Sequence, residues 1–307
     1  MIGPFPEWRQ PADVPEVPVG LSSASVYPLS VHDAFACAAD LGYDGVEVMV
    51  TNNSTSQEPD ALIQLSERYD QPIVSIHAPT LLLTQQVWGG AWTKIRRSCE
   101  MAREVGCDTV VVHPPFRWQA GYADGFAIGI RDLAEEYEVH IAVENMYPWR
   151  VRGRETRAYL PHWDPVGQGY QDVTWDFSHA ATAREDSLEA FKSLGDSLRH
   201  IHLTDGSGAS FRDEHLLPGQ GTQRVAECLQ YLADSAFDGV VVTEVSTRKA
   251  RVAGEREEML ATALDFARLH LGQFARPERS AERSAERSAE RSAERSAERS
   301  AAEQRTL

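Results

Sequence analysis

The feature that most constrains the fold is a strand-and-turn segment that recurs along the chain of 307 residues. Three such segments, at 42–48, 106–112 and 236–242, resemble one another. Each follows an amphipathic helical stretch and has a small residue at the helix end, an Asp in the turn, and then a run rich in β-branched residues. This order predicts a helix that leads through a short turn into a strand buried on both faces.

Further short apolar runs bring the candidate strands to eight, and these strands end at regular intervals. The intervals run from 25 residues (Ser22 to Glu47) to 42 residues (His202 to Glu244), which suits one strand–helix unit each. The predicted strand ends are Ser22, Glu47, His77, His113, Glu144, Asp176, His202 and Glu244. Apolar residues at helical spacing lie between them, at 31–41, 60–69, 92–105, 126–137, 187–194, 223–235 and 256–271. The stretch 155–172, which is rich in Pro and Gly, is predicted to be a loop.

Eight alternating units favour an α/β fold of the (β/α)8 TIM-barrel type. The alternative is a doubly wound sheet. The glycine-rich turn GxGxxG that is typical of dinucleotide-binding sheets does not follow the first strand, where the sequence reads VGLSS at 19–23. The barrel is therefore the preferred prediction.

The last part of the chain has a different composition. Residues 276–307 repeat the tetrapeptide ERSA and hold 8 Arg and 7 Glu, with no apolar residue larger than Ala before Leu307. Such a segment has nothing to bury and is expected to be disordered or a solvated helix. We therefore predict a barrel domain at 1–275 and an appended tail at 276–307.

Composition excludes several classes of protein. With 42% hydrophobic residues the chain can form a full core, and its four Cys have neither metal-finger nor disulfide-scaffold spacing. No apolar run reaches the length of about 18 residues that a membrane span needs, and no signal peptide is visible. We expect a cytoplasmic protein. The net charge of −16 disfavours binding to nucleic acid through phosphate neutralisation. Because net charge is a sum over the whole chain, it does not exclude a local basic groove.

Seven of the eight predicted strand ends carry Glu, Asp or His. The C-terminal ends of barrel strands form the active site of such folds, and buried carboxylates require neutralisation. The central set is Glu144, Asp176, His202 and Glu244, each of which closes an apolar run. Carboxylate and imidazole ligands together suit Zn, Mn, Fe or Co, so we predict one divalent metal ion at the barrel mouth.

A second set of residues lies close to the first in the predicted barrel. His77 and His113 end strands, while His179 and the pair Asp213 and His215 have spacings that let two side chains reach one site. We expect this set to hold substrate hydroxyl groups or additional ions, up to three ions in all.

The chain resembles the xylose isomerase-like TIM-barrel superfamily, which joins sugar (phosphate) isomerases and epimerases to endonuclease IV-type abasic-site endonucleases. The resemblance covers roughly residues 17–271 and rests on VENM (143–146), WDFSH (175–179), HIHLTD (200–205), DEHLLPGQG (213–221) and VVTEV (241–245). It implies that Glu144, Asp176, His202 and Glu244 bind the metal, and that Glu144 and Glu244 act as the acid/base pair on a small carbohydrate substrate. A homo-oligomer is compatible with this reading.

The endonuclease branch is the alternative, because its trinuclear zinc cluster has a counterpart here for every ligand. These are His77, His113, Glu144, Asp176, His179, His202, Asp213, His215 and Glu244. The sequence departs from that branch in the residues that follow His77, in WDFSH, and in Asp213-Glu214-His215, where an acid replaces a base. We therefore expect a metal-dependent isomerase or epimerase. A barrel that binds metal or sugar without catalysis is the third reading.

Overall fold

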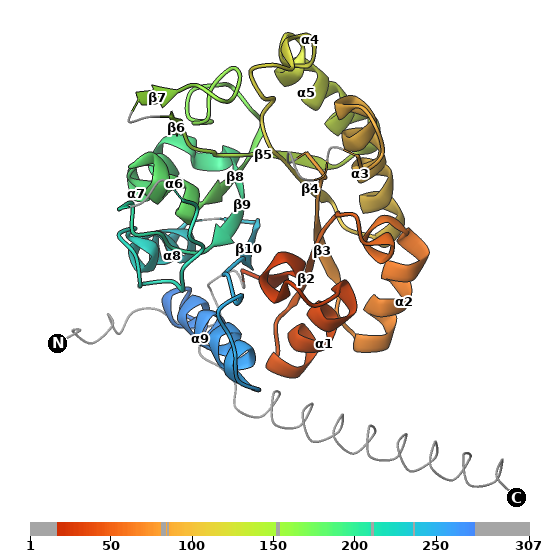
Figure 1. Ribbon diagram of the computed structural model, residues 1–307, viewed down its shortest axis with the longest axis vertical. Helices are drawn as coiled ribbons and strands as arrows, with labels where there is room; N and C mark the ends of the chain where they lie inside the picture. The colour runs from red at the N-terminus through yellow and green to blue at the C-terminus, as the bar shows by residue number, and fades with distance from the viewer. Residues whose placement is uncertain are drawn as a thin grey trace, which may run out of the picture. The chain divides into compact units, whose positions relative to one another are not determined.

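The computed structural model of the protein describes residues 17–80, 84, 86–151, 154–209, 212–235 and 237–273. In this part of the chain, parallel strands close into a barrel that helices surround (Figure 1). The strands follow one another around the barrel in sequence order, once a small hairpin is set aside. They are β1 (Val19–Ser22), β2 (Gly45–Met49), β3 (Ile73–His77), β4 (Thr109–Val112), β5 (His140–Glu144), β8 (Asp172–Asp176), β9 (Leu198–Leu203) and β10 (Val240–Thr243). The predicted (β/α)8 barrel is confirmed.

Helices connect successive strands on the outside of the barrel (Figure 1). They are α1 (Val31–Leu41), α2 (Pro59–Tyr69), α3 (Ala91–Val105), α5 (Phe126–Tyr137), α7 (Ser187–Leu194), α8 (Val225–Asp234) and α9 (Glu255–His270). Each matches a predicted helix within a few residues. Two short helices, α4 (Ala120–Ala123) and α6 (Phe177–Ala183), were not predicted.

The turn between α1 and β2 shows how the recurring sequence segment works. Helix α1 begins at a capping box in which Ser30 N donates to the Asp33 carboxylate at 2.8 Å. It ends at Gly42, whose φ of 82° lies in the left-handed region that glycine favours. The carboxylate of Asp44 then accepts a hydrogen bond from Val19 N at 2.8 Å. The small residue therefore ends the helix, and the Asp ties the turn to strand β1.

The core lies between the barrel and the helices. Val46 and Ile76 on the strands and Phe35 on α1 are fully buried. Trp175 in β8 is also buried, and its Nε1 donates to Ser187 Oγ at 2.9 Å, so this large side chain leaves no polar atom unpaired. Burial on both faces explains why the strands are almost continuously apolar.

Strand β1 ends at the predicted residue Ser22, whose Oγ accepts from Ala24 N at 3.3 Å and starts the 3-10 helix η1 (Ser23–Val26). The structure differs from the predicted elements in the region 149–156. The predicted loop at 155–172 begins inside a hairpin of β6 (Trp149–Val151) and β7 (Arg154–Thr156). The guanidinium of Arg150 donates to Glu155 Oε1 across this hairpin.

The chain divides into two units, Met1–Gln273 and Phe274–Leu307. The second unit, which contains the predicted tail at 276–307, lies outside the described residues. Within the described residues, no helix has both the length and the apolar character needed to cross a membrane.

Candidate metal centre

Four carboxylate and imidazole side chains meet at the C-terminal end of the barrel. Glu144 ends β5, Asp176 ends β8, His202 lies in β9 and Glu244 directly follows β10. One ligand atom from each lies within 4.8 Å of the other three. Nδ1 of His202 lies 3.1 Å from Glu144 Oε1, 3.0 Å from Glu244 Oε2 and 3.7 Å from Asp176 Oδ2. The structure therefore brings together the four residues that form the predicted central set.

A second group shares Glu144 with the first. Nε2 of His113 lies 2.9 Å from Glu144 Oε2, and Nε2 of His77 lies 3.5 Å from the same oxygen. The two imidazole nitrogens are 3.4 Å apart. Glu144 thus presents Oε1 to His202 and Oε2 to His77 and His113, so that one carboxylate bridges the two groups.

A third group shares Asp176 with the first. The carboxylate of Asp176 accepts a hydrogen bond from His179 N at 2.7 Å and so caps the N-terminus of α6. This cap places His179 on the first turn of the helix, where its Nε2 lies 3.2 Å from Asp213 Oδ2. Nε2 of His215 lies 2.6 Å from the same oxygen. The spacing Asp-x-x-His in the sequence therefore reflects a helix cap that also points two side chains at one site.

Ser178 holds Asp213 and His215 in place. Its hydroxyl donates to Asp213 Oδ1 at 2.6 Å and accepts from the backbone N–H groups of Glu214 and His215, each at 3.0 Å. Nδ1 of His215 lies 2.7 Å from the backbone oxygen of Glu244. The four histidines of the predicted second set thus lie beside the central four residues, and Asp213 contacts two of them, His179 and His215.

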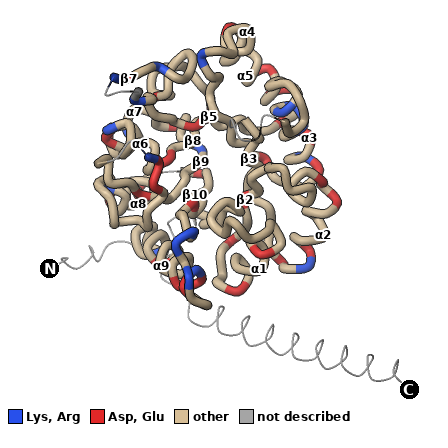
Figure 2. Tube along the Cα trace, viewed as in Figure 1, with Lys and Arg blue, Asp and Glu red and all other residues tan. Residues whose placement is uncertain are grey.

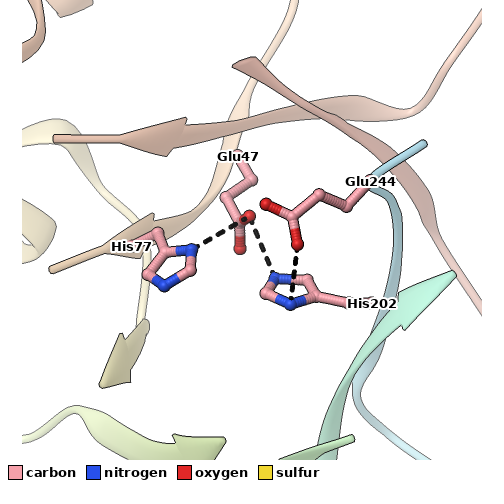
Figure 3. Close-up of side chains that lie close together, drawn as sticks. All are labelled: Glu47, His77, His202 and Glu244. Carbon is pink, nitrogen blue, oxygen red and sulfur yellow. Dashed lines mark hydrogen bonds and ion pairs between the residues drawn. The ribbon is translucent and has the colours of Figure 1, made fainter. Parts of the chain in front are cut away.

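Sequence reasoning missed Glu47 as a site residue, although it counted Glu47 among the strand ends. Glu47 is completely buried in β2, and its Oε1 lies 3.2 Å from His202 Nε2 and 3.9 Å from His77 Nδ1 (Figure 3). Its Oε2 accepts a hydrogen bond from Ser75 Oγ at 2.8 Å and lies 3.0 Å from His200 Nε2. The sequence signal was similar to that of the central four residues, a carboxylate in an apolar run, although β2 continues for two residues beyond Glu47.

The side chains perturb one another electrostatically. Burial alone would lower the pKa of His202, but the charges of Glu244, Glu47 and Glu144 raise this pKa well above its usual value. Burial also raises the pKa of Glu244 to about 7, against the opposing effect of His202. For Glu144, burial would raise the pKa, but His202 and the nearby His113 hold it well below its usual value. The two glutamates that contact the same imidazole therefore differ in proton affinity.

The donor atoms fit a divalent cation. Asp176 Oδ2 and Glu144 Oε2 are buried and accept no hydrogen bond from the described residues. Unbonded carboxylate oxygens are costly in a protein interior unless a positive charge neutralises them. Together with imidazole nitrogens they form the mixed O/N set that Zn, Mn, Fe and Co prefer.

A loop next to the site is organised by a buried carboxylate. Asp205, which follows β9, accepts hydrogen bonds from the backbone N–H groups of Gly206, Gly219, Gly221 and Gln223 at 2.8 to 3.2 Å. A Cβ atom at Gly221 would collide with the Asp205 carboxylate. The glycines of the sequence segment 213–221 thus allow the backbone to wrap closely around this side chain.

Comparisons with known proteins show the family to which the chain is similar. A family model described as xylose isomerase-like TIM barrel matches residues 35–270. An uncharacterized protein of Mycobacterium tuberculosis (strain ATCC 25618 / H37Rv) is 48% identical over 277 residues, which cover 84% of this chain and 99% of the relative. Fructoselysine 3-epimerase of Escherichia coli O157:H7 is 22% identical and is matched over 74% of this chain and 90% of its own length.

A solved structure has the same fold. The crystal structure of the IolI protein, described as having a binding zinc atom, superposes with a TM-score of 0.62 at 17% sequence identity. The match covers 84% of this chain and 99% of that protein. This likeness extends the agreement in fold over nearly the whole of the described barrel.

Proposed function

Because the chain belongs to the xylose isomerase-like TIM-barrel family, we propose that it is a divalent-metal-dependent isomerase or epimerase of a small sugar or sugar phosphate. One observation carries the proposal. Two buried carboxylates, Glu144 and Glu244, contact the same nitrogen of His202 and differ in proton affinity. A pair of carboxyl groups with different proton affinities, set beside a metal centre, suits the removal and return of a proton.

In this function Glu144, Asp176, His202 and Glu244 hold the metal ion. The ion, when bound, polarises the carbonyl and neighbouring hydroxyl oxygens of the substrate and so makes the intervening C–H more acidic. One of the two glutamates removes this proton, and the other returns a proton to the same carbon or its neighbour. His179 and His215 are placed to hold substrate hydroxyl groups beside the central four.

The relatives support this class of reaction. One is a fructoselysine 3-epimerase, and the solved structure of the IolI protein contains zinc. We extend to the present chain the reaction type and the metal, while the sugar itself is left to experiment. We also propose that residues 1–275 form the catalytic barrel domain and that the ERSA repeat at 276–307 is an appended tail.

The experiment is incubation of the metal-loaded protein with a panel of ketoses and ketose phosphates in D2O. Sugar isomerisation or epimerisation by proton transfer incorporates deuterium at the carbon next to the carbonyl, and NMR or mass spectrometry detects this. Glu144→Gln in the same assay should incorporate none. Exchange that is equal in the wild type and in Glu144→Gln would contradict the assignment.

A second candidate function rests on the way the three groups join. Glu144 links the first group to His77 and His113, and Asp176 links it to His179 and His215. Such a chain of sites could hold three ions, as in endonuclease IV-type enzymes, and could hydrolyse a phosphodiester. The net charge of −16, and the mixture of acidic and basic segments over the outer helices, speak for the small substrate (Figure 2). Three bound zinc ions per chain together with cleavage of abasic DNA would favour this second function.

A further inference from the structure

Glu47 lies below two of the histidines that face the metal centre. Its Oε1 is 3.2 Å from Nε2 of His202 and 3.9 Å from Nδ1 of His77 (Figure 3). In both rings the other nitrogen faces Glu144: Nδ1 of His202 at 3.1 Å, and Nε2 of His77 at 3.5 Å. Glu47 and Glu144 therefore contact opposite edges of the same two imidazoles.

The orientation of Glu47 is fixed from its second oxygen. Ser75 Oγ donates to Oε2 at 2.8 Å, and His200 Nε2 lies 3.0 Å from the same atom. Glu47, Ser75 and His200 are completely buried, so water does not compete for these contacts. These two contacts hold Oε2 in place, so that Oε1 faces His202.

An imidazole can give only one nitrogen to an ion when the other carries a proton. A hydrogen bond from His202 Nε2–H to Glu47 fixes the tautomer in which Nδ1 has a free lone pair. That nitrogen is the one surrounded by Glu144, Asp176 and Glu244. A carboxylate partner on the far side of the ring also makes the ligating nitrogen more basic.

We infer that Glu47 is a positioning residue for the metal centre, which orients His202 by accepting a hydrogen bond from the ring nitrogen that faces away from the ion. The inference rests on the metal binding in the proposed function, but not on the identity of the sugar or on the reaction. It distinguishes Glu47 from a metal ligand, although its carboxylate also lies within 4.8 Å of donor atoms of His77, His202 and Glu244.

The test compares zinc binding by the full-length wild type, by Glu47→Gln and by the exposed control Glu67→Gln. Affinity and stoichiometry are measured by competition with a chromogenic chelator. We expect Glu47→Gln to bind the same number of ions as the wild type with about 10- to 100-fold lower affinity. Glu67→Gln should match the wild type. An unchanged affinity in Glu47→Gln, or the loss of a whole ion from its stoichiometry, would overturn the inference.

A spectroscopic measurement separates positioning from a general structural effect. In the zinc-loaded wild type, 15N-edited NMR should show the His202 Nε2–H proton as a slowly exchanging low-field signal, assigned by its absence in His202→Asn. The signal should shift upfield or exchange with solvent in Glu47→Gln. Retention of the signal at its wild-type position would overturn the inference.

Two further comparisons cover the cases in which Glu47→Gln does not fold and in which the protein binds no metal ion. If Glu47→Gln does not fold, Ser75→Ala takes its place, because it removes only the hydrogen bond from Ser75 Oγ to Glu47 Oε2. This variant should bind zinc severalfold more weakly than the wild type, with the same stoichiometry. Wild-type affinity in Ser75→Ala would then overturn the inference. A wild type that binds none of the ions Zn, Mn, Fe and Co would overturn both the proposed function and the inference. Wild-type zinc binding that Glu47→Gln leaves unchanged would overturn the inference alone.

Discussion

Glu144 and His202 are 58 residues apart in the sequence, yet Nδ1 of His202 lies 3.1 Å from Glu144 Oε1. The contact exists because β5 and β9 flank β8 in the barrel, so their C-terminal ends open onto the same rim. The second oxygen of Glu144 contacts His77 and His113 from β3 and from the residue after β4. A single carboxylate on β5 thus contacts side chains from three other strands or strand ends.

Replacing Glu144 by Gln should lower turnover of the ketose substrate by about 10²- to 10⁴-fold, because a proton-transferring carboxylate is lost. Glu244→Gln should have an effect of the same order. Both losses are measured as initial rates and as deuterium incorporation from D2O. Glu135→Gln, on the exposed face of α5, is the control and should retain wild-type rates.

Binding of a divalent ion should stabilise the fold, because the ion neutralises the buried carboxylates of Glu144 and Asp176, each of which has one oxygen without a hydrogen bond from the described residues. Free metal at one hundred times its dissociation constant should add about 2.7 kcal/mol to the free energy of unfolding. Thermal unfolding with excess zinc or manganese, and after dialysis against a chelator, measures the difference. Equal melting temperatures under both conditions would show that no tight site exists.

Metal binding should release protons near neutral pH. In the metal-free site, burial would lower the pKa of His202 and His215, but nearby carboxylates raise the pKa of His202 well above its usual value and that of His215 to about 10. An ion at the central four residues must displace the proton of His202, and an ion beside His179 and His215 would displace that of His215, so the apparent affinity should rise as the pH increases from 6 to 9. Calorimetry in buffers of different ionisation enthalpy counts the released protons. An affinity that falls over this range would contradict the expectation.

The substitution Asp213→Asn distinguishes a site that binds one ion from a site that binds three. Asp213 contacts His179 and His215 but belongs to neither of the groups that contain Glu144. With one ion at the central four residues, Asp213→Asn should keep that ion with an affinity within about threefold of the wild type. Metal analysis of the two purified proteins provides the measurement. A decrease from three ions to two would favour the hydrolytic candidate instead.

Asp205→Ala should destabilise the protein by about 3 kcal/mol, because the buried Asp205 carboxylate accepts hydrogen bonds from four backbone N–H groups. Urea denaturation of the metal-free protein measures this loss. Asp124→Asn, at an exposed position, is the control and should unfold like the wild type. Gly221→Ala should also destabilise the protein, because the Cβ of the alanine would displace the Asp205 carboxylate.

Much of the fold was predictable from the sequence. The helical spacing of apolar residues, the small residue at the end of each helix and the β-branched runs that follow are local signals, and they predicted the barrel and its order of elements. Ser30 and Gly42 show the reason, since a cap or a left-handed turn depends only on residues a few positions away. Where a local contact was overlooked, as at Asp176, which caps the N-terminus of α6, a short helix was missing from the prediction.

The sequence by itself determined which strand ends carry carboxylates and imidazoles, because a charged residue at the end of an apolar run is visible without a structure. Only the tertiary structure decided how these side chains pair. Whether Glu144 bridges His202 and His113, or whether Glu47 lies behind His202, depends on barrel closure and on the register of neighbouring strands. Those relations join residues tens of positions apart, and the orientation of each packed ring decides which nitrogen faces which oxygen.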